Sequence, residues 1–344
     1  MKAGSSIARR VVVALGCAAL LLPALSAVDA ARAADKTYVM KLSTATLNDT
    51  QHEYMKLLVA AVDKASGGRI KGEVYPASQL GPIPRQIEGT QFGSIQGWVG
   101  PPEFLVGLDR RYELLSAPGL FESMAHADRA IHDPAFAKAF LALGGDKGLV
   151  GASLFLSAPT VFVTREPLRK LDDFKGKKIR VLASAFQMDQ MKVVGAVGVP
   201  MALGDVLPAL QQGAIDGAMG SVPVFEALHY YDAGKYLTET NQAMIATVAV
   251  LSKKWLSSLP ADLRKIVIDE SAKIGAGMFP ISDRLYQEGR KKWTQHGGEL
   301  IALSKADEAA MMKKVVAVGP EVVKGKPAMQ KLYDLLAAAA KKTK

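Results

Sequence analysis

One arginine stands inside a segment that otherwise predicts a buried strand followed at once by a helix. The segment is KKIRVLAS, residues 177–184, and the arginine is Arg180. A guanidinium stays protonated in proteins, so burying it without a partner is costly. Its N–H donors form a planar fork that matches a carboxylate through two parallel hydrogen bonds. Two interpretations follow: Arg180 lies on an exposed face or pairs with an acid such as Asp216, or it binds the carboxylate of a ligand.

The predicted topology favours the ligand interpretation. In open α/β sheets, ligands bind at the carboxyl ends of the strands, beside the N-termini of helices. Arg180 lies near the end of its predicted strand, just before a helix that begins near Ser184. A ligand at this edge of the sheet would supply the negative charge that the strand lacks.

Sequence patterns for catalysis and for metal binding do not occur in this chain. The histidines do not pair as HExxH or HxH, so no metal-ligand spacing arises. There is no GxSxG motif, no GxxxxGK[ST] phosphate loop, and no GxGxxG motif after a strand. The sequence therefore predicts neither an enzyme nor a bound cofactor or metal. The five histidines are His52, His126, His132, His229 and His296.

The first 33 residues have the features of a secretory signal peptide. Residues 2–10 carry three basic side chains, residues 11–25 are apolar, and Ala31-Arg32-Ala33 fits a small-x-small cleavage site. The apolar run of roughly 15 residues is shorter than the ~20 that a membrane-spanning helix needs. We expect cleavage near residue 33 and export to the periplasm. An uncleaved N-terminal anchor is the alternative.

The charge and the cysteine content of the chain argue against disulfides, thiolate metal sites and a nucleic-acid partner. The only cysteine, Cys17, lies in residues 1–33, so the mature chain can form no disulfide and no thiolate metal site. The precursor carries a net charge of +10, of which residues 1–33 contribute +3. The remaining basic residues are interspersed with acids, and no RNA-binding aromatic signature accompanies them, which argues against a nucleic-acid partner. A mild positive field would instead attract small anions.

Two blocks of the chain predict the same order of elements, β-α-β-α-β. The blocks are residues 36–100 and 177–221. They share a pattern at their ends, because FGSIQGWVG (92–100) and QGAIDGAMG (212–220) both place glycine, isoleucine and glycine two positions apart. Strands that alternate with helices imply open sheets with mostly parallel pairing. We therefore predict an α/β fold of two domains with a similar plan.

The remaining pattern predicts how the two domains are joined. Residues 261–298 predict a very long helix that spans both domains, with Pro280 able to kink it. No low-complexity linker is present, so strands that cross between the domains should form a hinge. The expected arrangement is an open mixed sheet in each domain, with a ligand cleft between the domains. Domain I is predicted as residues 34–157 and 246–285, and domain II as residues 158–245 and 286–344.

Four segments resemble, in this order, the solute-binding proteins of tripartite ATP-independent periplasmic (TRAP) transporters, of the C4-dicarboxylate-binding DctP type. The segments are YPASQLGP (75–82), LSAPGLF (115–121), DDFKGKKIR (172–180) and LPALQQGAIDGA (207–218). The resemblance implies the periplasmic binding protein fold, in which two α/β domains close on a ligand. It also implies that Arg180 pairs with the substrate carboxylate. The closed form would dock on a membrane permease made of a small and a large integral subunit, and we expect the chain to be a monomer.

Two departures from the family pattern change the expected ligand. Many relatives carry a second arginine near LSAPTVF (156–162), where this chain has Ser157, Ala158 and Pro159. Gly220 also stands where relatives often have an asparagine that contacts the ligand. We therefore expect a less polar pocket and a monocarboxylate with an apolar body, such as an aromatic acid or a branched 2-oxo acid. A C4-dicarboxylate is the alternative ligand.

Several candidate ligand contacts have a second, structural interpretation. Trp98 offers a flat surface for stacking or belongs to the core. Thr46 and Asn48 donate to the ligand or cap the next helix, and Arg85 approaches the cleft or lies on the surface. A receptor that signals to a sensor kinase and a periplasmic enzyme on this fold are the alternative functions. The full set of predicted contacts is Arg180, Trp98, Phe186, Met219, Gly220, Asn48, Thr46 and Arg85.

Overall fold

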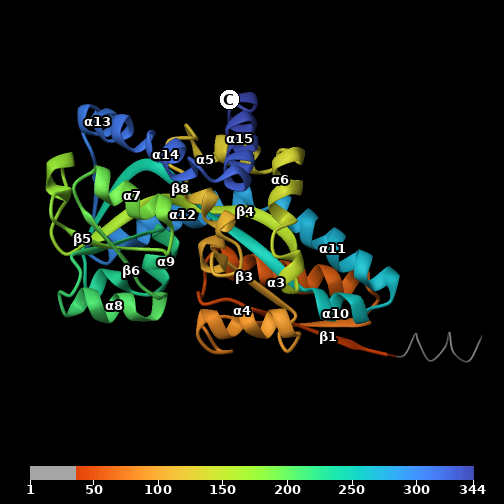
Figure 1. The fold of residues 1–344 in the computed structure, drawn as a ribbon. Coiled ribbons are helices and arrows are strands. Elements are labelled where there is room, and N and C mark those ends of the chain that lie inside the picture. The colour runs from red at the N-terminus through yellow and green to blue at the C-terminus, as the bar shows by residue number, and fades with distance from the viewer. Residues whose placement is uncertain (1–35) are drawn as a thin grey trace, which may run out of the picture.

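The computed structural model of the chain describes residues 36–344 (Figure 1). The predicted signal peptide, residues 1–33, lies outside the described residues. Within residues 36–344, no helix is both long enough and apolar enough to span a membrane.

Nine strands in the described part of the chain form one mixed sheet, in the order β2-β1-β3-β8-β4-β7-β5-β6, with β9 beside β8. Strands β1, β2 and β3 pair in parallel, as do β5, β6 and β7, whereas β4 and β8 run antiparallel to their sheet neighbours β7 and β3 and to each other. We call the side with β1–β3 the first half and the side with β5–β7 the second half. The strands are β1 (Tyr38–Ser43), β2 (Ile70–Tyr75), β3 (Gly97–Gly100), β4 (Leu149–Thr164), β5 (Lys178–Val181), β6 (Val197–Pro200), β7 (Gly217–Gly220), β8 (Tyr236–Ser252) and β9 (Glu299–Ala302).

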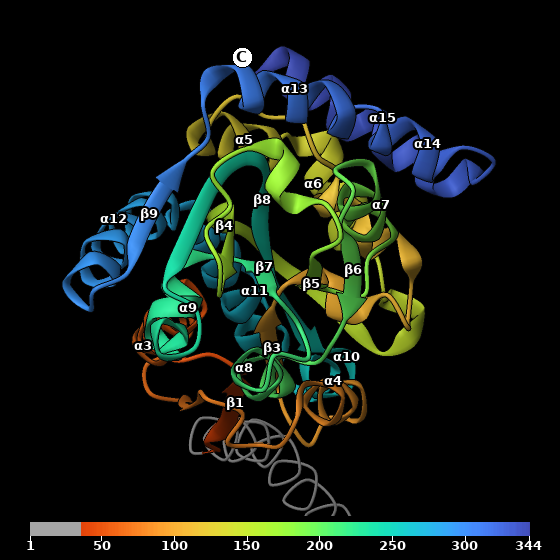
Figure 2. The same cartoon turned by 90° about the vertical axis from the view of Figure 1, so that its left-hand side faces the viewer.

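Helices surround this sheet, and the last three of them lie together on one side of the molecule (Figures 1 and 2). The α-helices are α3 (Thr50–Ala65), α4 (Ile83–Phe92), α5 (Met124–Ile131), α6 (Pro134–Leu141), α7 (Ala185–Val193), α8 (Leu203–Gln211), α9 (Val222–Ala227), α10 (Lys253–Ser258), α11 (Ala261–Ala276), α12 (Phe279–Gln295), α13 (Lys305–Val315), α14 (Val318–Val323) and α15 (Pro327–Lys342). The 3-10 helices are η1 (Pro102–Leu105), η2 (Arg110–Ser116), η3 (Gly145–Lys147), η4 (Leu171–Phe174) and η5 (Tyr230–Asp232).

The two β-α-β-α-β blocks repeat each other in their hydrogen bonds as well as in their order. In the first block, the Gln96 side chain accepts from the backbone N–H of Lys41 at 3.0 Å. In the second, the Asp216 side chain accepts from the backbone N–H of Lys178 at 2.7 Å. Both acceptors come immediately before the third strand of their block and fasten it to the first. The duplicated α/β plan predicted from the sequence is thus present in the structure.

Two long strands, β4 and β8, join the halves, as the predicted crossing strands require (Figure 1). They pair with each other over almost their whole length, and the register shifts between Gly151 and Ser153 and twice between Leu156 and Val161. Such bulges bend a strand and increase its local twist. The two shifts between Leu156 and Val161 lie between the part of the β4–β8 pair beside β3 and the part beside β7.

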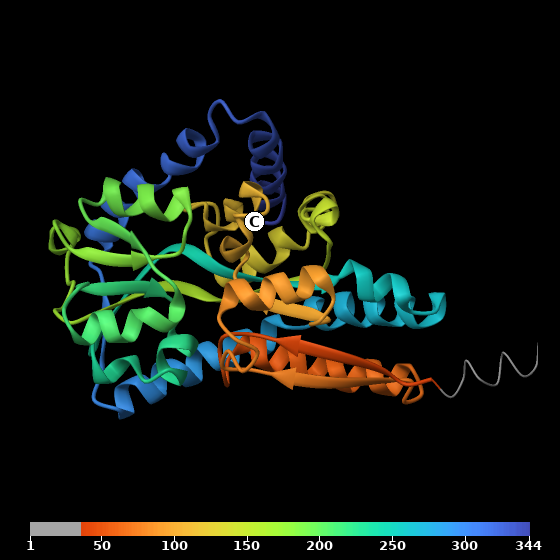
Figure 3. The same cartoon turned by 60° about the horizontal axis from the view of Figure 1, so that its bottom comes forward.

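The predicted long helix is two helices in the structure, which corrects that expectation. Helix α11 ends at Ala276, and α12 begins at Phe279. Pro280 is the physical cause, since it has no N–H to donate to the carbonyl of Ala276 four residues earlier. Helix α11 packs against α3 and β4, whereas α12 packs against α9 of the second half as well as β4. The two helices follow one another across the molecule (Figure 3).

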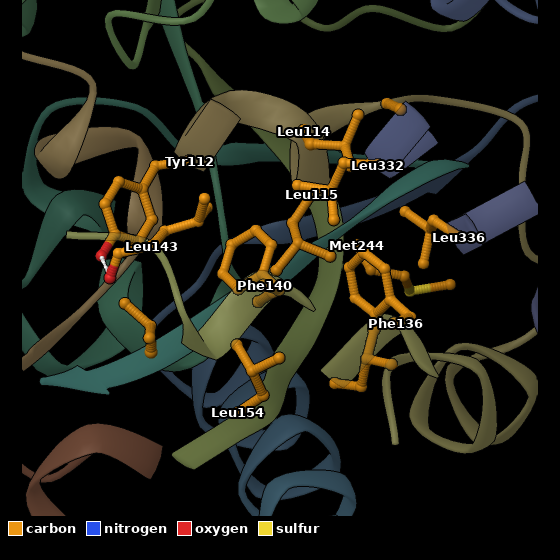
Figure 4. Packing of buried hydrophobic residues seen from close by; sticks show 14 of the residues in the cluster. Tyr112, Leu114, Leu115, Phe136, Phe140, Leu143, Leu154, Met244, Leu332 and Leu336 are labelled. Atoms are coloured by element: carbon orange, nitrogen blue, oxygen red, sulfur yellow. Dashed lines mark hydrogen bonds between the residues drawn. The ribbon is translucent and has the colours of Figure 1, made fainter. Parts of the chain in front are cut away.

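The largest apolar cluster lies between η2, α5, α6 and the C-terminal helix α15 (Figure 4). Leu332 and Leu336 of α15 pack into it beside Phe136 and Phe140 of α6, and the Tyr112 hydroxyl donates to a backbone carbonyl at its edge. Helix α15 therefore contacts elements that follow β3 in the sequence, although the predicted boundaries placed residues 286–344 in domain II. The exact domain boundaries stay a prediction.

Candidate functional site

Arg180 lies near the end of β5 and is buried, with 4% of its surface exposed. Its Nε and Nη2 both donate to the backbone carbonyl of Met201, at 3.1 and 3.0 Å. No carboxylate among residues 36–344 forms an ion pair with it, and Asp216 bonds to a backbone N–H instead. The structure therefore excludes both an exposed Arg180 and a pair between Arg180 and Asp216.

Burial makes the positive charge of Arg180 costly to keep. Loss of solvation lowers the pKa of Arg180 to about 10, and the charge interaction with Tyr230 acts in the opposite direction. A group with this pKa is still almost fully protonated at neutral pH. The site therefore holds a buried cation whose only hydrogen-bond partner among the described residues is one neutral carbonyl, which leaves it able to bind an anion.

A cavity between the two halves reaches Arg180. The centre of a water molecule can occupy about 50 Å³ of it. Of the described residues that line it, Arg180 alone carries a charge, and most of the others are apolar. The wall from the first half consists of Ala45, Thr46, Gln51, Ile83, Trp98, Val99, Gly100, Pro101 and Phe104. The wall from the second half and β8 consists of Arg180, Leu182, Leu203, Met219, Gly220, Ser221, Val224, Phe225 and Ile245.

Five of the eight predicted contacts lie on this wall: Arg180, Trp98, Thr46, Met219 and Gly220. Trp98 serves both interpretations of its role, because it lines the cavity while its side chain is 1% exposed and belongs to the apolar core. Its ring meets Phe104 edge-on, with the ring centroids 6.5 Å apart.

The glycine at position 220 has a steric reason. A Cβ atom there would lie 2.7 Å from the ring of Phe225, which itself lines the cavity. An asparagine at this position would collide with that ring. Gly220 therefore leaves room for the Phe225 ring on the cavity wall, and this ring makes the wall less polar.

The other three predicted residues lie away from the cavity wall. Phe186 is fully buried in the core beside η2, because its position in the first turn of α7 turns its ring away from the cavity. Asn48 is exposed with φ of 54°, and it is Asp49 that caps α3 by accepting from the N–H of His52. Arg85 is exposed on α4 beside a separate surface hollow.

Two polar residues on the wall were missed in the sequence. Gln51 lies in the first turn of α3, and its Oε1 accepts from the Thr44 hydroxyl at 2.9 Å, which orients its amide N–H groups away from Thr44. Ser221 directly follows β7. Ser221 comes just after the carboxyl end of its strand, and Gln51 lies at the N-terminus of the helix that follows β1, so the rule that singled out Arg180 would have found them.

The described residues contain no cluster of three or more histidine, cysteine, aspartate or glutamate side chains that could hold a metal ion. The chemistry of the cavity is thus that of a buried cationic fork, a few neutral hydrogen-bonding groups and an apolar wall. Such a set can bind and orient an anionic molecule that has an apolar surface.

Residues 42–325 match the DctP family, described as bacterial extracellular solute-binding protein, family 7, and the chain belongs to that family. Its fold is that of TRAP periplasmic solute-binding proteins. The structure of one from Desulfovibrio salexigens, with bound orotic acid, superposes with a TM-score of 0.84 at 21% identity, covering 90% of this chain and 100% of that one.

Two further proteins have somewhat higher identity. A TRAP periplasmic solute-binding protein from Xanthobacter autotrophicus Py2, with bound β-D-galacturonate, is 26% identical with a TM-score of 0.77, covering 88% of this chain and 99% of that one. The C4-dicarboxylate-binding periplasmic protein DctP of Rhodobacter capsulatus is 26% identical over 59% of this chain and 61% of its own length.

Proposed function

We propose that this chain is the periplasmic receptor of a TRAP transporter, which captures an organic acid through its carboxylate and delivers it to the small and large subunits of a membrane permease. The observation that carries this proposal is the state of Arg180, which is buried on a cavity wall with no acidic partner among the described residues. Family membership and the galacturonate-bound relative support a carboxylate as the missing anion.

The proposed ligand is a monocarboxylate with an apolar body, such as an aromatic acid or a branched 2-oxo acid. Arg180 is the single charged group on the described wall, so a second carboxylate would be buried without a cation. Trp98, Phe104 and Phe225 would face the body of the ligand. A C4-dicarboxylate is the second candidate ligand, because the R. capsulatus relative is named as a C4-dicarboxylate-binding protein.

The proposed mechanism is capture without turnover. A ligand carboxylate would accept hydrogen bonds from Arg180 while the halves are apart, and their closure would remove water from the cavity. Removing water strengthens the ion pair, because the local dielectric constant falls. Binding then shifts the population toward the closed form by the difference in ligand affinity between the two forms.

A screen of organic acids by thermal shift, followed by titration calorimetry of Arg180 variants, tests the proposal. The panel contains aromatic acids, branched 2-oxo acids, sugar acids and C4-dicarboxylates. Arg180→Lys keeps the charge but loses the planar fork, so we expect an affinity lower by about tenfold or more, and a larger loss in Arg180→Ala. Arg85→Ala, which removes an exposed arginine outside the cavity, is the matched control and should bind as the unmodified protein does.

Unchanged affinity in both Arg180 variants would refute the carboxylate site. Binding of C4-dicarboxylates alone would refute the monocarboxylate assignment and leave the second candidate. Conversion of a bound acid into a product would refute capture without turnover.

A further inference from the structure

Helix α7, which follows Arg180 in the chain, is capped by a side chain from the other half of the molecule. Ser184 occupies its N-cap position, yet the serine hydroxyl is buried without a hydrogen-bond partner among the described residues. Instead, Oε2 of Glu113 accepts from the backbone N–H of Ala185, the first residue of the helix, at 2.6 Å. Glu113 belongs to η2 and is 1% exposed.

A second buried contact reaches the same loop from η2. Gln187 of α7 uses its Oε1 to accept from the N–H of Leu182, two residues after Arg180, at 2.8 Å. Its Nε2 donates to the hydroxyl of Ser116 at 3.1 Å. The backbone carbonyl of Ser116 accepts in turn from Nε2 of Gln190, at 2.9 Å. The three residues Gln187, Ser116 and Gln190 are all buried.

These contacts cross between the two halves. Helix η2 follows β3, and α7 follows β5, and the strand order places β3 and β5 on opposite sides of the β4–β8 pair. Leu182 also lines the cavity, so the loop from Arg180 to Ala185 faces the ligand space and η2 together.

We propose that Glu113 and Ser116 are positioning residues for ligand binding, which hold the Arg180 loop in its binding geometry only when the two halves are together. This inference rests on the proposed function, because it requires the halves to separate and close. A helix N-terminus has backbone N–H groups without internal acceptors, and a carboxylate is a favoured partner for them. Closure provides that partner, and a ligand on Arg180 holds the same loop from the cavity side.

Ligand binding to Arg180 and the capping of α7 by Glu113 are therefore linked. A ligand that favours the closed form strengthens the contacts of η2 with α7, and by reciprocity these contacts raise the affinity for the ligand. Neither Glu113 nor Ser116 lines the cavity, so their effect on affinity acts through the loop.

Two variants delete the cap from opposite sides. Glu113→Ala removes the acceptor. Ala185→Pro removes the donor N–H, at a first helical position where proline is tolerated, after a Ser184 whose extended backbone suits a following proline. We expect each to weaken binding of the acid identified by the screen by about tenfold, as for a lost hydrogen bond to a charged group. The double variant should be little worse than either, since both remove one interaction.

Controls separate positioning from a purely structural role. Glu113→Gln keeps an acceptor oxygen and should recover most of the affinity, and Glu88→Ala removes an exposed acid on α4 and should change nothing. The melting temperature without ligand should stay near that of the unmodified protein, while the rise caused by ligand becomes smaller. A lower melting temperature without ligand, together with unchanged affinity, would refute the proposal.

The outcome for the proposed function is read separately. If the acid binds in an Arg180-dependent way but Glu113→Ala and Ala185→Pro bind it as tightly as the unmodified protein, only the positioning role fails. If Arg180 variants also bind normally, the proposed carboxylate site fails as well.

Discussion

At the scale of single residues, Arg180 and Glu103 lose the solvation of their charged forms on burial, and their hydrogen-bond partners replace it only in part. Arg180 keeps one backbone carbonyl as its partner. Glu103 of η1 is likewise buried, with 4% of its surface exposed. Burial raises the pKa of Glu103 to about 7, the Ser116 hydroxyl opposes that rise by donating to the carboxylate, and the negative charge of Glu113 adds to it. Near neutral pH, Glu103 therefore changes its charge inside the protein.

The raised pKa of Glu103 predicts how stability depends on pH. The folded protein holds this proton up to about pH 7, whereas an ordinary glutamate releases it near 4.5. Stability from this group is complete below pH 4.5 and is lost as pH rises to about 7, because the unfolded chain then binds fewer protons. Glu103→Gln removes the titration, so its unfolding free energy relative to the unmodified protein should rise by about 3 kcal/mol between pH 4.5 and 8.

Denaturant unfolding at a series of pH values measures this difference. Glu88→Gln, an exposed acid, serves as the control and should show no such trend. A difference between Glu103→Gln and the unmodified protein that is constant with pH would show that Glu103 does not titrate in this range.

At the scale of elements, glycines in the short strands β3 and β7 allow these strands to pack closely against their neighbours beside the cavity. A Cβ atom at Gly217 of β7 would lie 2.6 Å from the backbone carbonyl oxygen of Val163 in β4. Gly97 occupies the same place in the first block, where a Cβ would lie 2.7 Å from the Leu42 side chain. The glycines shared by the two blocks thus allow close contact between neighbouring strands.

Gly217→Ala should therefore destabilise the protein by about 1–3 kcal/mol, the usual cost of overpacking. The clash is with backbone, so a rotamer change cannot relieve it. Gly204→Ala is the matched control: it lies in helix α8 with open space around it, and alanine should be neutral or slightly stabilising there. Equal unfolding free energies for the two variants, measured in urea, would contradict this account of β7.

At the scale of the whole molecule, two long strands with register shifts connect the halves, which also contact each other through η2 and α7 and enclose the cavity between them. The connection is continuous through the sheet, so any closing motion must bend β4 and β8 rather than swing on a flexible tether. Bulges between Gly151 and Val161 are where such bending has the fewest regular hydrogen bonds to strain.

This arrangement predicts that the bound acid makes the molecule more compact. The radius of gyration from small-angle scattering should fall when ligand is added, because the closed form is favoured. Arg180→Ala should show no such fall at the same ligand concentration. Equal radii for the unmodified protein with and without saturating ligand would contradict hinge closure.

The sequence by itself determined the alternation of strands and helices and the duplication, and it singled out Arg180 as a candidate ligand contact. These depend on local periodicity, on glycine and proline, and on the cost of burying a charge, all of which a short segment contains. Pro280 marked the place where the long helix divides. The sequence does not say whether a proline kinks a helix or ends it.

Only the tertiary structure decided which side chains face the cavity and which contacts join the halves. Phe186 points into the core while Ser221 and Gln51 line the cavity, because the packing of α7, α3 and β7 sets their directions. The cap of α7 by Glu113 brings together residues 72 positions apart. Long-range contacts of this kind arise from the packing of separate elements, and no local pattern in the chain encodes them.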